Sequence, residues 1–106
     1  MNTPVQRSEA VLSLIGNTPL VPLRFKSEGV TLLAKCEFLN PSGSVKDRLA
    51  RHVILDAKQR GLLRPDSIIL ECSSGNTGIA MSTVGAAVGI TSPFSCPAAR
   101  ARSDGV

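Results

Sequence analysis

The sequence predicts an α/β fold, in which short apolar strands alternate with helices along a parallel sheet. Strand-like segments at residues 30–38 and 67–72 are each followed by a Ser/Gly-rich turn and then by a helical pattern. This repeated order of strand, turn and helix is typical of a parallel sheet with right-handed crossovers. The chain of 106 residues has room for one small domain.

The N-terminal part is expected to be extended. Residues 15–23 contain Pro19 and Pro22, which exclude a helix and favour a turn that leads into an extended segment. Residues 30–38 are rich in apolar and β-branched side chains and predict a strand. That strand ends at a dense turn signal in residues 40–44, Asn-Pro-Ser-Gly-Ser.

Two helices are expected in the second half. The first runs from Val45 to Arg60, with Ser44 as its N-cap and Gly61 as its C-terminal stop. Its apolar face consists of Leu49, Ala50, Val53, Ile54 and Ala57. The second, a helix of small residues over 79–88, follows a buried strand and the turn at residues 73–78. Ligands of such folds bind beyond the carboxyl ends of the strands, so both Ser/Gly turns are expected at one edge of one sheet.

Composition excludes several classes of function. Three phenylalanines are the only aromatic residues, and the net charge of +4 is spread without a basic block, so no nucleic-acid partner is expected. The N-terminus lacks the pattern of a secretory signal and no apolar run approaches a membrane span, which predicts a cytoplasmic protein. The three cysteines have neither CxxC nor Cys/His spacing, and His52 has no second imidazole nearby, so no metal site is expected.

The first Ser/Gly turn carries a lysine suited to covalent chemistry. Lys46 falls in the first turn of the predicted helix, where unpaired backbone N–H groups form a positive end. A cation is disfavoured there, which favours the neutral amine that attacks aldehydes in Schiff-base chemistry. On spacing alone, an ordinary solvated helix start explains the same residues and stays open.

The second turn has the composition of an anion site. Residues 73–78 offer hydroxyls, a side-chain amide and backbone N–H groups at a helix N-terminus, which together suit a carboxylate or a phosphate. The alternative is a structural turn in which Thr77 caps the next helix. The chain lacks the glycine patterns of the common nucleotide-binding loops.

Three segments resemble one known family. They read Ile-Gly-Asn-Thr-Pro-Leu at residues 15–20, Leu-Asn-Pro-Ser-Gly-Ser-Val-Lys-Asp-Arg at residues 39–48, and Ser-Ser-Gly-Asn-Thr-Gly-Ile-Ala at residues 73–80. In this order and spacing they resemble the N-terminal part of the cysteine synthase and cystathionine β-synthase family, among the fold type II enzymes that use pyridoxal 5'-phosphate (PLP). The resemblance covers about residues 11–89 and implies an incomplete three-layer parallel sheet of the tryptophan synthase β-like fold.

The resemblance implies a role for each turn. Lys46 would hold PLP as a Schiff base and act as the catalytic base, and Asn76 would hydrogen-bond the 3′-oxygen of the cofactor. The carboxylate of the amino-acid substrate would be bound by Ser73, Ser74, Gly75 and Thr77. The implied reaction is a β-replacement by a homodimeric enzyme, in which O-acetylserine and sulfide give L-cysteine. A cystathionine β-synthase-like enzyme and a fragment that binds no cofactor stay open as alternatives.

The chain also departs from the family. Ser73 stands where the family usually has Thr, which keeps the hydroxyl but removes the methyl that restricts its rotamer. The family's glycine loop for the PLP phosphate and its Ser partner for the pyridine nitrogen lie downstream of the matching segments. Residues 90–106 differ from the family, and a one-nucleotide shift of back-translated codons restores a family-like run. We therefore expect residues 1–89 to be the N-terminal part of the enzyme domain and residues 90–106 to be an out-of-frame or divergent tail, with little activity in the fragment.

Overall fold

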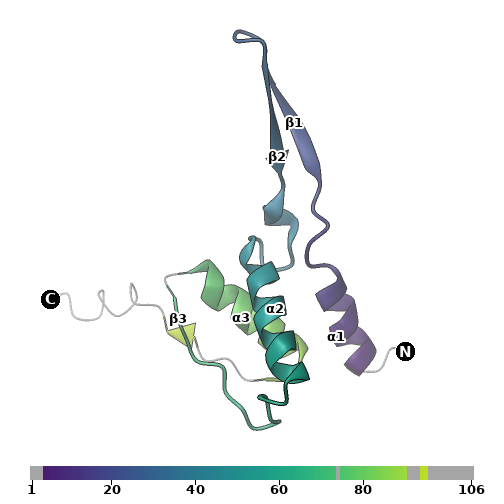
Figure 1. The fold of residues 1–106 in the computed structure, drawn as a ribbon, viewed down its shortest axis with the longest axis vertical. Helices are drawn as coiled ribbons and strands as arrows, with labels where there is room; N and C mark the ends of the chain where they lie inside the picture. The colour runs from purple at the N-terminus through teal and green to yellow at the C-terminus, as the bar shows by residue number, and fades with distance from the viewer. Residues whose placement is uncertain (1–3, 74, 91–93, 96–106) are drawn as a thin grey trace, which may run out of the picture.

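The computed structural model describes residues 4–73, 75–90 and 94–95, and Figure 1 shows their arrangement. The helices are α1 (Pro4–Ser13), α2 (Lys46–Gln59) and α3 (Asn76–Ala87), with a 3-10 turn η1 (Glu37–Leu39) before α2. The strands are β1 (Leu20–Phe25), β2 (Val30–Lys35), β3 (Glu71–Cys72) and β4 (Phe94–Ser95). The three helices gather together, and the hairpin of β1 and β2 projects away from them (Figure 1).

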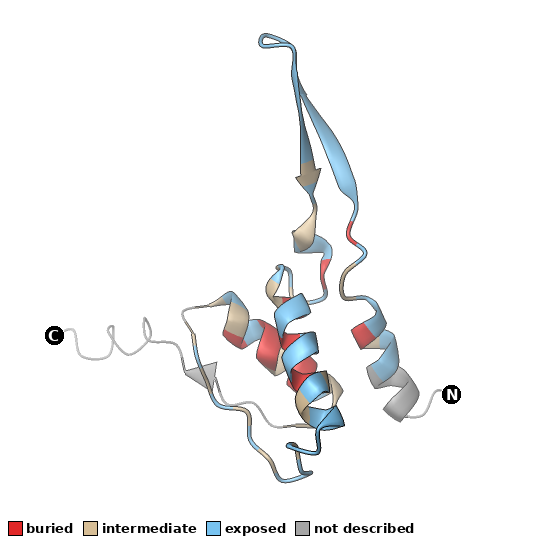
Figure 2. Ribbon diagram, in the orientation of Figure 1, coloured by how far each residue is buried: buried red, intermediate tan, exposed pale blue. Residues whose placement is uncertain are grey.

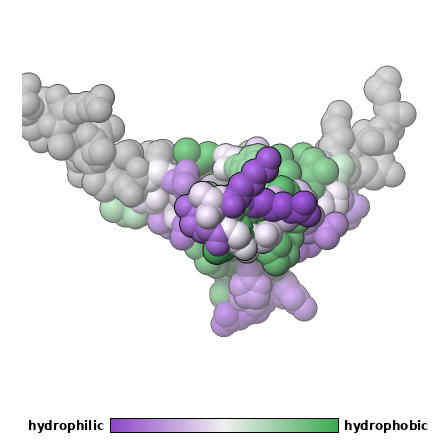
Figure 3. All heavy atoms as spheres, turned by 90° about the horizontal axis from the view of Figure 1, so that it is seen from above, coloured by the Kyte–Doolittle hydropathy of each residue, from purple (hydrophilic) through white to green (hydrophobic). Residues whose placement is uncertain are grey.

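The hairpin pairs antiparallel along its whole length, from Leu20 opposite Lys35 to Phe25 opposite Val30. Pro22 is tolerated in β1 because, among the described strands, β1 has a partner on one side only. Side chains of successive strand residues point to opposite faces, and one face of this hairpin is apolar throughout. This apolar hairpin face consists of Val21, Leu23, Phe25, Val30, Leu32 and Ala34. Figure 2 shows the hairpin exposed over most of its length, and its tip is hydrophilic (Figure 3).

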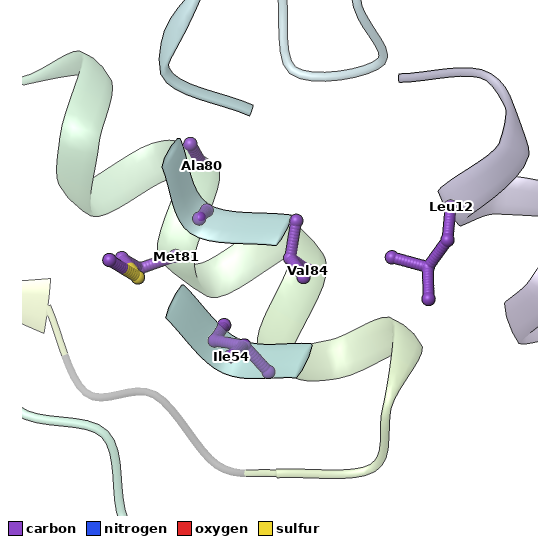
Figure 4. Close-up of a cluster of buried hydrophobic side chains, with 6 residues drawn as sticks. Leu12, Ile54, Ala80, Met81 and Val84 are labelled. Carbon is purple, nitrogen blue, oxygen red and sulfur yellow. The ribbon is translucent and has the colours of Figure 1, made fainter. Parts of the chain in front are cut away.

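The core lies between α2 and α3, with α1 packed beside α3. Its buried side chains are Leu12, Ala50, Ile54, Ala80, Met81 and Val84 (Figure 4). Ala50 and Ala80 are fully buried, and such small side chains let the two helices approach closely. The helix pair therefore positions the two turns that precede α2 and α3.

Both helices end in the same way. After α2, Gly61 has φ +71°, and the N–H of Leu62 donates to the carbonyl of Ala57 at 2.9 Å. After α3, Gly89 has φ +79°, and the N–H of Ile90 donates to the carbonyl of Gly85 at 2.8 Å. Both are Schellman motifs, in which a glycine in the left-handed region satisfies the last carbonyls of a helix. The prediction that Gly61 stops the first predicted helix is confirmed.

Several predicted elements are confirmed. The helix expected from Val45 to Arg60 is α2, and the strand expected at residues 30–38 is the shorter β2. β3 and β4 pair in parallel with α3 between them, which is the strand–helix–strand unit of the predicted α/β class. Helix α1 was not predicted from the sequence.

Three expectations, about the second strand, the sheet and the cap, were wrong. The buried strand expected over residues 67–72 is only the two-residue β3, and Ile68 and Leu70 are exposed, because β3 pairs with a strand on one side only among the described residues. The turns were expected at one edge of a single sheet, but β2 pairs with β1 and the described strands form two separate sheets. The physical reason is that a short connection favours the neighbouring strand as partner, because closing a short loop costs little entropy. The N-cap of α2 is Val45 rather than Ser44, although the Ser44 hydroxyl still accepts a hydrogen bond from the N–H of Lys46 at 3.2 Å.

Candidate functional site

Lys46 is the first residue of α2 and is half-buried. The residue after it, Asp47, is 0% exposed. The Asp47 carboxylate accepts a hydrogen bond from the backbone N–H of Ser42 at 2.8 Å and another from the Ser42 hydroxyl. Lys46 therefore lies inside a short loop whose two ends are joined by hydrogen bonds.

Asn40 joins the same turn to the N-terminal segment. Its side chain is almost completely buried, and its Oδ1 accepts a hydrogen bond from the backbone N–H of Gly16 at 2.8 Å. Its amide nitrogen donates to the carbonyl of Glu37 at 2.8 Å and to Glu37 Oε2 at 3.0 Å. Every polar atom of the Asn40 side chain is thus used inside the chain, which makes it a structural link.

Arg48 and Glu37 form the ion pair that holds α2 against η1. Arg48 Nε lies 2.8 Å from Glu37 Oε2 and Nη2 lies 2.9 Å from Oε1, a bidentate arrangement. The Thr18 hydroxyl donates to Glu37 Oε1 at 2.6 Å and accepts from Arg48 Nη2 at 3.2 Å. Hydrogen bonds from Arg48, then from Thr18 and Asn40, lower the pKa of Glu37 from 4.5 to about 2. The hydrogen bond to Glu37 in turn raises the pKa of Arg48.

Gly16 is required at its position by its backbone and by its neighbour. It has φ +85°, and a Cβ atom added there would lie 3.0 Å from Arg48 Nη1. A side chain would be strained in this conformation and would press on the guanidinium. The glycine therefore allows the close approach of residues 15–20 to the Arg48 side chain.

The second turn is more open. Helix α3 begins at Asn76 with Gly75 as its N-cap, so Thr77 lies inside the helix and the alternative in which Thr77 caps it is wrong. The Ser73 hydroxyl accepts a hydrogen bond from the N–H of Gly75 at 3.2 Å. Asn76 is exposed and its side chain makes no hydrogen bond to another described residue.

The α3 start also leaves backbone donors available. The first helical hydrogen bond of α3 runs from the N–H of Ile79 to the carbonyl of Gly75, at 3.1 Å. Among the described residues, the N–H groups of residues 76–78 have no helical acceptor, as is usual at a helix start. Ser74, one of the residues predicted to bind substrate, lies outside the described residues.

The predicted site residues lie at or just before the starts of two packed helices, and among the described ones no hydrogen bond joins the two groups. Lys46 begins α2 and Asn76 begins α3, and these helices share the core. No hydrogen bond joins the described residues of one turn to those of the other. The catalytic role of Lys46 and the binding roles of Ser73, Gly75, Asn76 and Thr77 stay predictions.

Several residues around the first turn form hydrogen bonds that were not predicted from the sequence. These framework residues are Gly16, Thr18, Glu37, Asn40, Asp47 and Arg48. All except Glu37 fall within the segments that resemble the family, which was the available signal. Neither periodicity nor composition predicts these hydrogen bonds, because the bonded residues lie up to 30 positions apart in the sequence.

The described part of the chain also contains a groove beside α2. A groove of about 380 Å³ runs along α2 and is lined by Ile15, Arg51, His52 and Leu55 among others, but not by Lys46. Over residues 4–73, 75–90 and 94–95, no three His, Cys, Asp or Glu side chains form a group that could hold a metal ion. In the same residues, no helix has the length and apolar character needed to cross a bilayer.

Comparison with known proteins finds cysteine synthases both among the sequence relatives and among the solved structures. The family model described as pyridoxal-phosphate dependent enzyme matches residues 11–102. The cysteine synthase of Aquifex aeolicus is 46% identical over 97 residues, which cover 85% of this chain and 29% of that protein. The cystathionine beta-synthase of Apis mellifera is 51% identical over 83 residues, covering 74% and 16%. The crystal structure of cysteine synthase from Entamoeba histolytica superposes with a TM-score of 0.74 at 36% identity, covering 87% of this chain and 30% of that one. The chain thus spans less than a third of the length of these relatives.

Proposed function

Because the chain belongs to the family of pyridoxal-phosphate dependent enzymes, we propose that it carries the cofactor lysine of a cysteine synthase-like enzyme, and that this lysine is Lys46. The observation that carries the proposal is the position of Lys46 at the first residue of α2, in a turn fixed by the buried Asp47. A half-buried amine on such a turn can react with an aldehyde while its direction is held.

The residues of the two turns fit PLP. Lys46 would bind the aldehyde carbon of the cofactor, and Asn76, whose amide is exposed and uncommitted among the described residues, would hydrogen-bond a ring oxygen. PLP, when bound, supplies an electron sink for charge that develops at the substrate Cα. Lys46 Nζ would accept the α-proton of the substrate. The substrate carboxylate would be oriented by Ser73, Ser74, Gly75 and Thr77.

The specific reaction proposed is β-replacement on O-acetylserine with sulfide, giving L-cysteine. Its support is the similarity to the cysteine synthases of Aquifex aeolicus and Entamoeba histolytica. We place this activity in the cytoplasm and in a homodimer for the whole protein. For the 106 residues alone we propose little or no turnover, because they span less than a third of those relatives.

A cystathionine β-synthase-like activity is the second candidate. It is favoured by the 51% identity to the cystathionine beta-synthase of Apis mellifera. The two candidates differ in the acceptor, sulfide or homocysteine. Supplying each acceptor to the chain with PLP and O-acetylserine, and measuring cysteine against cystathionine, separates them wherever turnover is found.

The test of the proposed function is covalent PLP binding by the purified chain. We expect PLP to give a visible absorbance band that Lys46→Ala abolishes. Lys58→Ala is the matched control, because Lys58 is an exposed lysine in the last turn of the same helix. A band that both variants lose, or that Lys46→Ala keeps, would contradict the proposal. A wild-type chain without a band would support the fragment that binds no cofactor.

A further inference from the structure

We propose that Asp47 is a positioning residue for Lys46, whose buried carboxylate holds Ser42 and thereby sets the direction of the neighbouring amine. This inference rests on the proposed function of Lys46. It adds a specific residue through which the chain orients its nucleophile.

The first support is the way in which Asp47 is held. Its side chain is 0% exposed, and both carboxylate oxygens accept hydrogen bonds from one residue, Ser42. A buried carboxylate needs such compensation, because desolvation disfavours the charge. As the second residue of α2, Asp47 also lies where the unpaired N–H groups of a helix favour a negative charge. Within the described part of the chain it forms no ion pair, so hydrogen bonds carry its compensation.

The second support is the open surroundings of two residues in the loop that Asp47 closes, Gly43 and Val45. Gly43 has φ +93°, and a Cβ atom added there would meet nothing within 4 Å. Val45, the residue before the lysine, has 47% of its surface exposed. At these two positions side-chain packing contributes little, so the hydrogen bonds to Asp47 are important in holding the loop. Loss of the bonds to Asp47 would free the loop without uncovering the core.

The third support is the separation of this contact from the neighbouring network. Arg48 and Glu37 bind α2 to η1 and to Thr18, not to residues 42–45. Variants of Glu37 should therefore weaken the framework while leaving the Ser42–Asp47 contact in place. This gives a control that changes a partly exposed ion pair, whose arginine is two residues from Lys46, without changing residues 42–45.

The experiment measures how selectively PLP reacts with Lys46. PLP at limiting concentration is added to the chain and fixed with borohydride, and peptide mass spectrometry gives the ratio of pyridoxyl label on Lys46 to label on Lys58. We expect Ser42→Ala and Asp47→Asn to lower this ratio about tenfold, the size expected for losing a hydrogen bond to a buried charge. Ser42→Thr, which keeps the hydroxyl, should restore it, and Glu37→Gln should leave it unchanged.

The outcomes separate the two proposals. A wild-type chain that labels Lys46 no more than Lys58 overturns the proposed function, and the inference with it. A wild-type preference for Lys46 that Ser42→Ala retains, with circular dichroism unchanged, overturns the role of Asp47 alone. If Asp47→Asn fails to fold, Ser42→Ala and Ser42→Thr decide the matter. An equal loss in Glu37→Gln also overturns the inference, because it would show a general loosening.

Discussion

The two Ser/Gly turns precede helices of the same packed pair, yet they are built differently. In the first turn, Asn40 and Asp47 are buried and every side-chain acceptor they have is bonded within the chain. In the second, Asn76 is exposed and Ser73 contributes one hydrogen bond, to Gly75. A nucleophile that must point in one direction benefits from hydrogen bonds within its own chain. Polar groups that bind a ligand must instead be free of hydrogen bonds within the chain, so that the ligand can take them. The contrast is the one expected if the first turn presents a nucleophile and the second receives its ligand.

The largest expected effect separates the two asparagines. Asn40→Ala should lower the free energy of unfolding by about 1–3 kcal/mol, because it removes a buried side chain and leaves the half-buried N–H of Gly16 without its acceptor. Asn76→Ala should change it by less than about 0.5 kcal/mol, because that side chain is exposed. Urea denaturation of both variants measures the difference. Equal losses would erase the contrast between the turns.

Glycine substitutions should give the next largest effect. Gly16→Ala should cost about 1–2 kcal/mol from its positive φ, and more from the contact with Arg48. Gly43→Ala is the matched control, since Gly43 has a similar φ but open space around it. The excess of the first loss over the second, measured by thermal unfolding, reports the Arg48 contact. Identical losses would show that the guanidinium moves aside freely.

The Glu37–Arg48 pair predicts a pH dependence. The folded-state pKa of Glu37 is about 2, below its ordinary value of 4.5, so the carboxylate stabilises the fold above pH 4.5. That contribution is lost as the pH falls from about 4.5 to about 2. The stability difference between the wild-type chain and Glu37→Gln should therefore shrink over this interval and be constant above it. A difference that persists at pH 2 would contradict the assignment.

The smallest expected effect concerns Ser73. Ser73→Thr keeps the hydroxyl that accepts the N–H of Gly75, so the free energy of unfolding should change by less than about 0.5 kcal/mol. The added methyl restricts the rotamer, and amide hydrogen exchange at Gly75 should become slower. Faster exchange would show that the threonine side chain turns away from Gly75.

The sequence predicted the elements better than it predicted their partners. Helical spacing and Gly61 located α2 to within a residue at each end, since both signals are local. The pairing of β2 with β1 was missed, because strand pairing depends on segments that periodicity does not compare. Of the expected apolar face of α2, Ala50 and Ile54 are buried but Leu49 and Val53 are not. Spacing identifies which side of a helix is apolar, but not how much of it the chain covers.

The candidate site was predicted in part for the same reason. The places of Lys46 and Asn76 at two helix starts were predicted because each occupies a recognisable turn, while their roles stay predictions. The polar links among Thr18, Glu37 and Arg48 were missed, because they join residues 11 to 30 positions apart and follow no repeat. Polar contacts between residues so far apart in the sequence can be identified only in the folded structure.

The Schellman motif after α3 has a consequence for protein engineering. Its two hydrogen bonds end at the N–H groups of Gly89 and Ile90, so the stop signal is complete before residue 91. The end of α3 therefore depends on hydrogen bonds within residues 85–90 and on no residue after them. A linker, a tag or a different continuation of the chain could be grafted after Ile90 without unwinding the helix that presents Asn76.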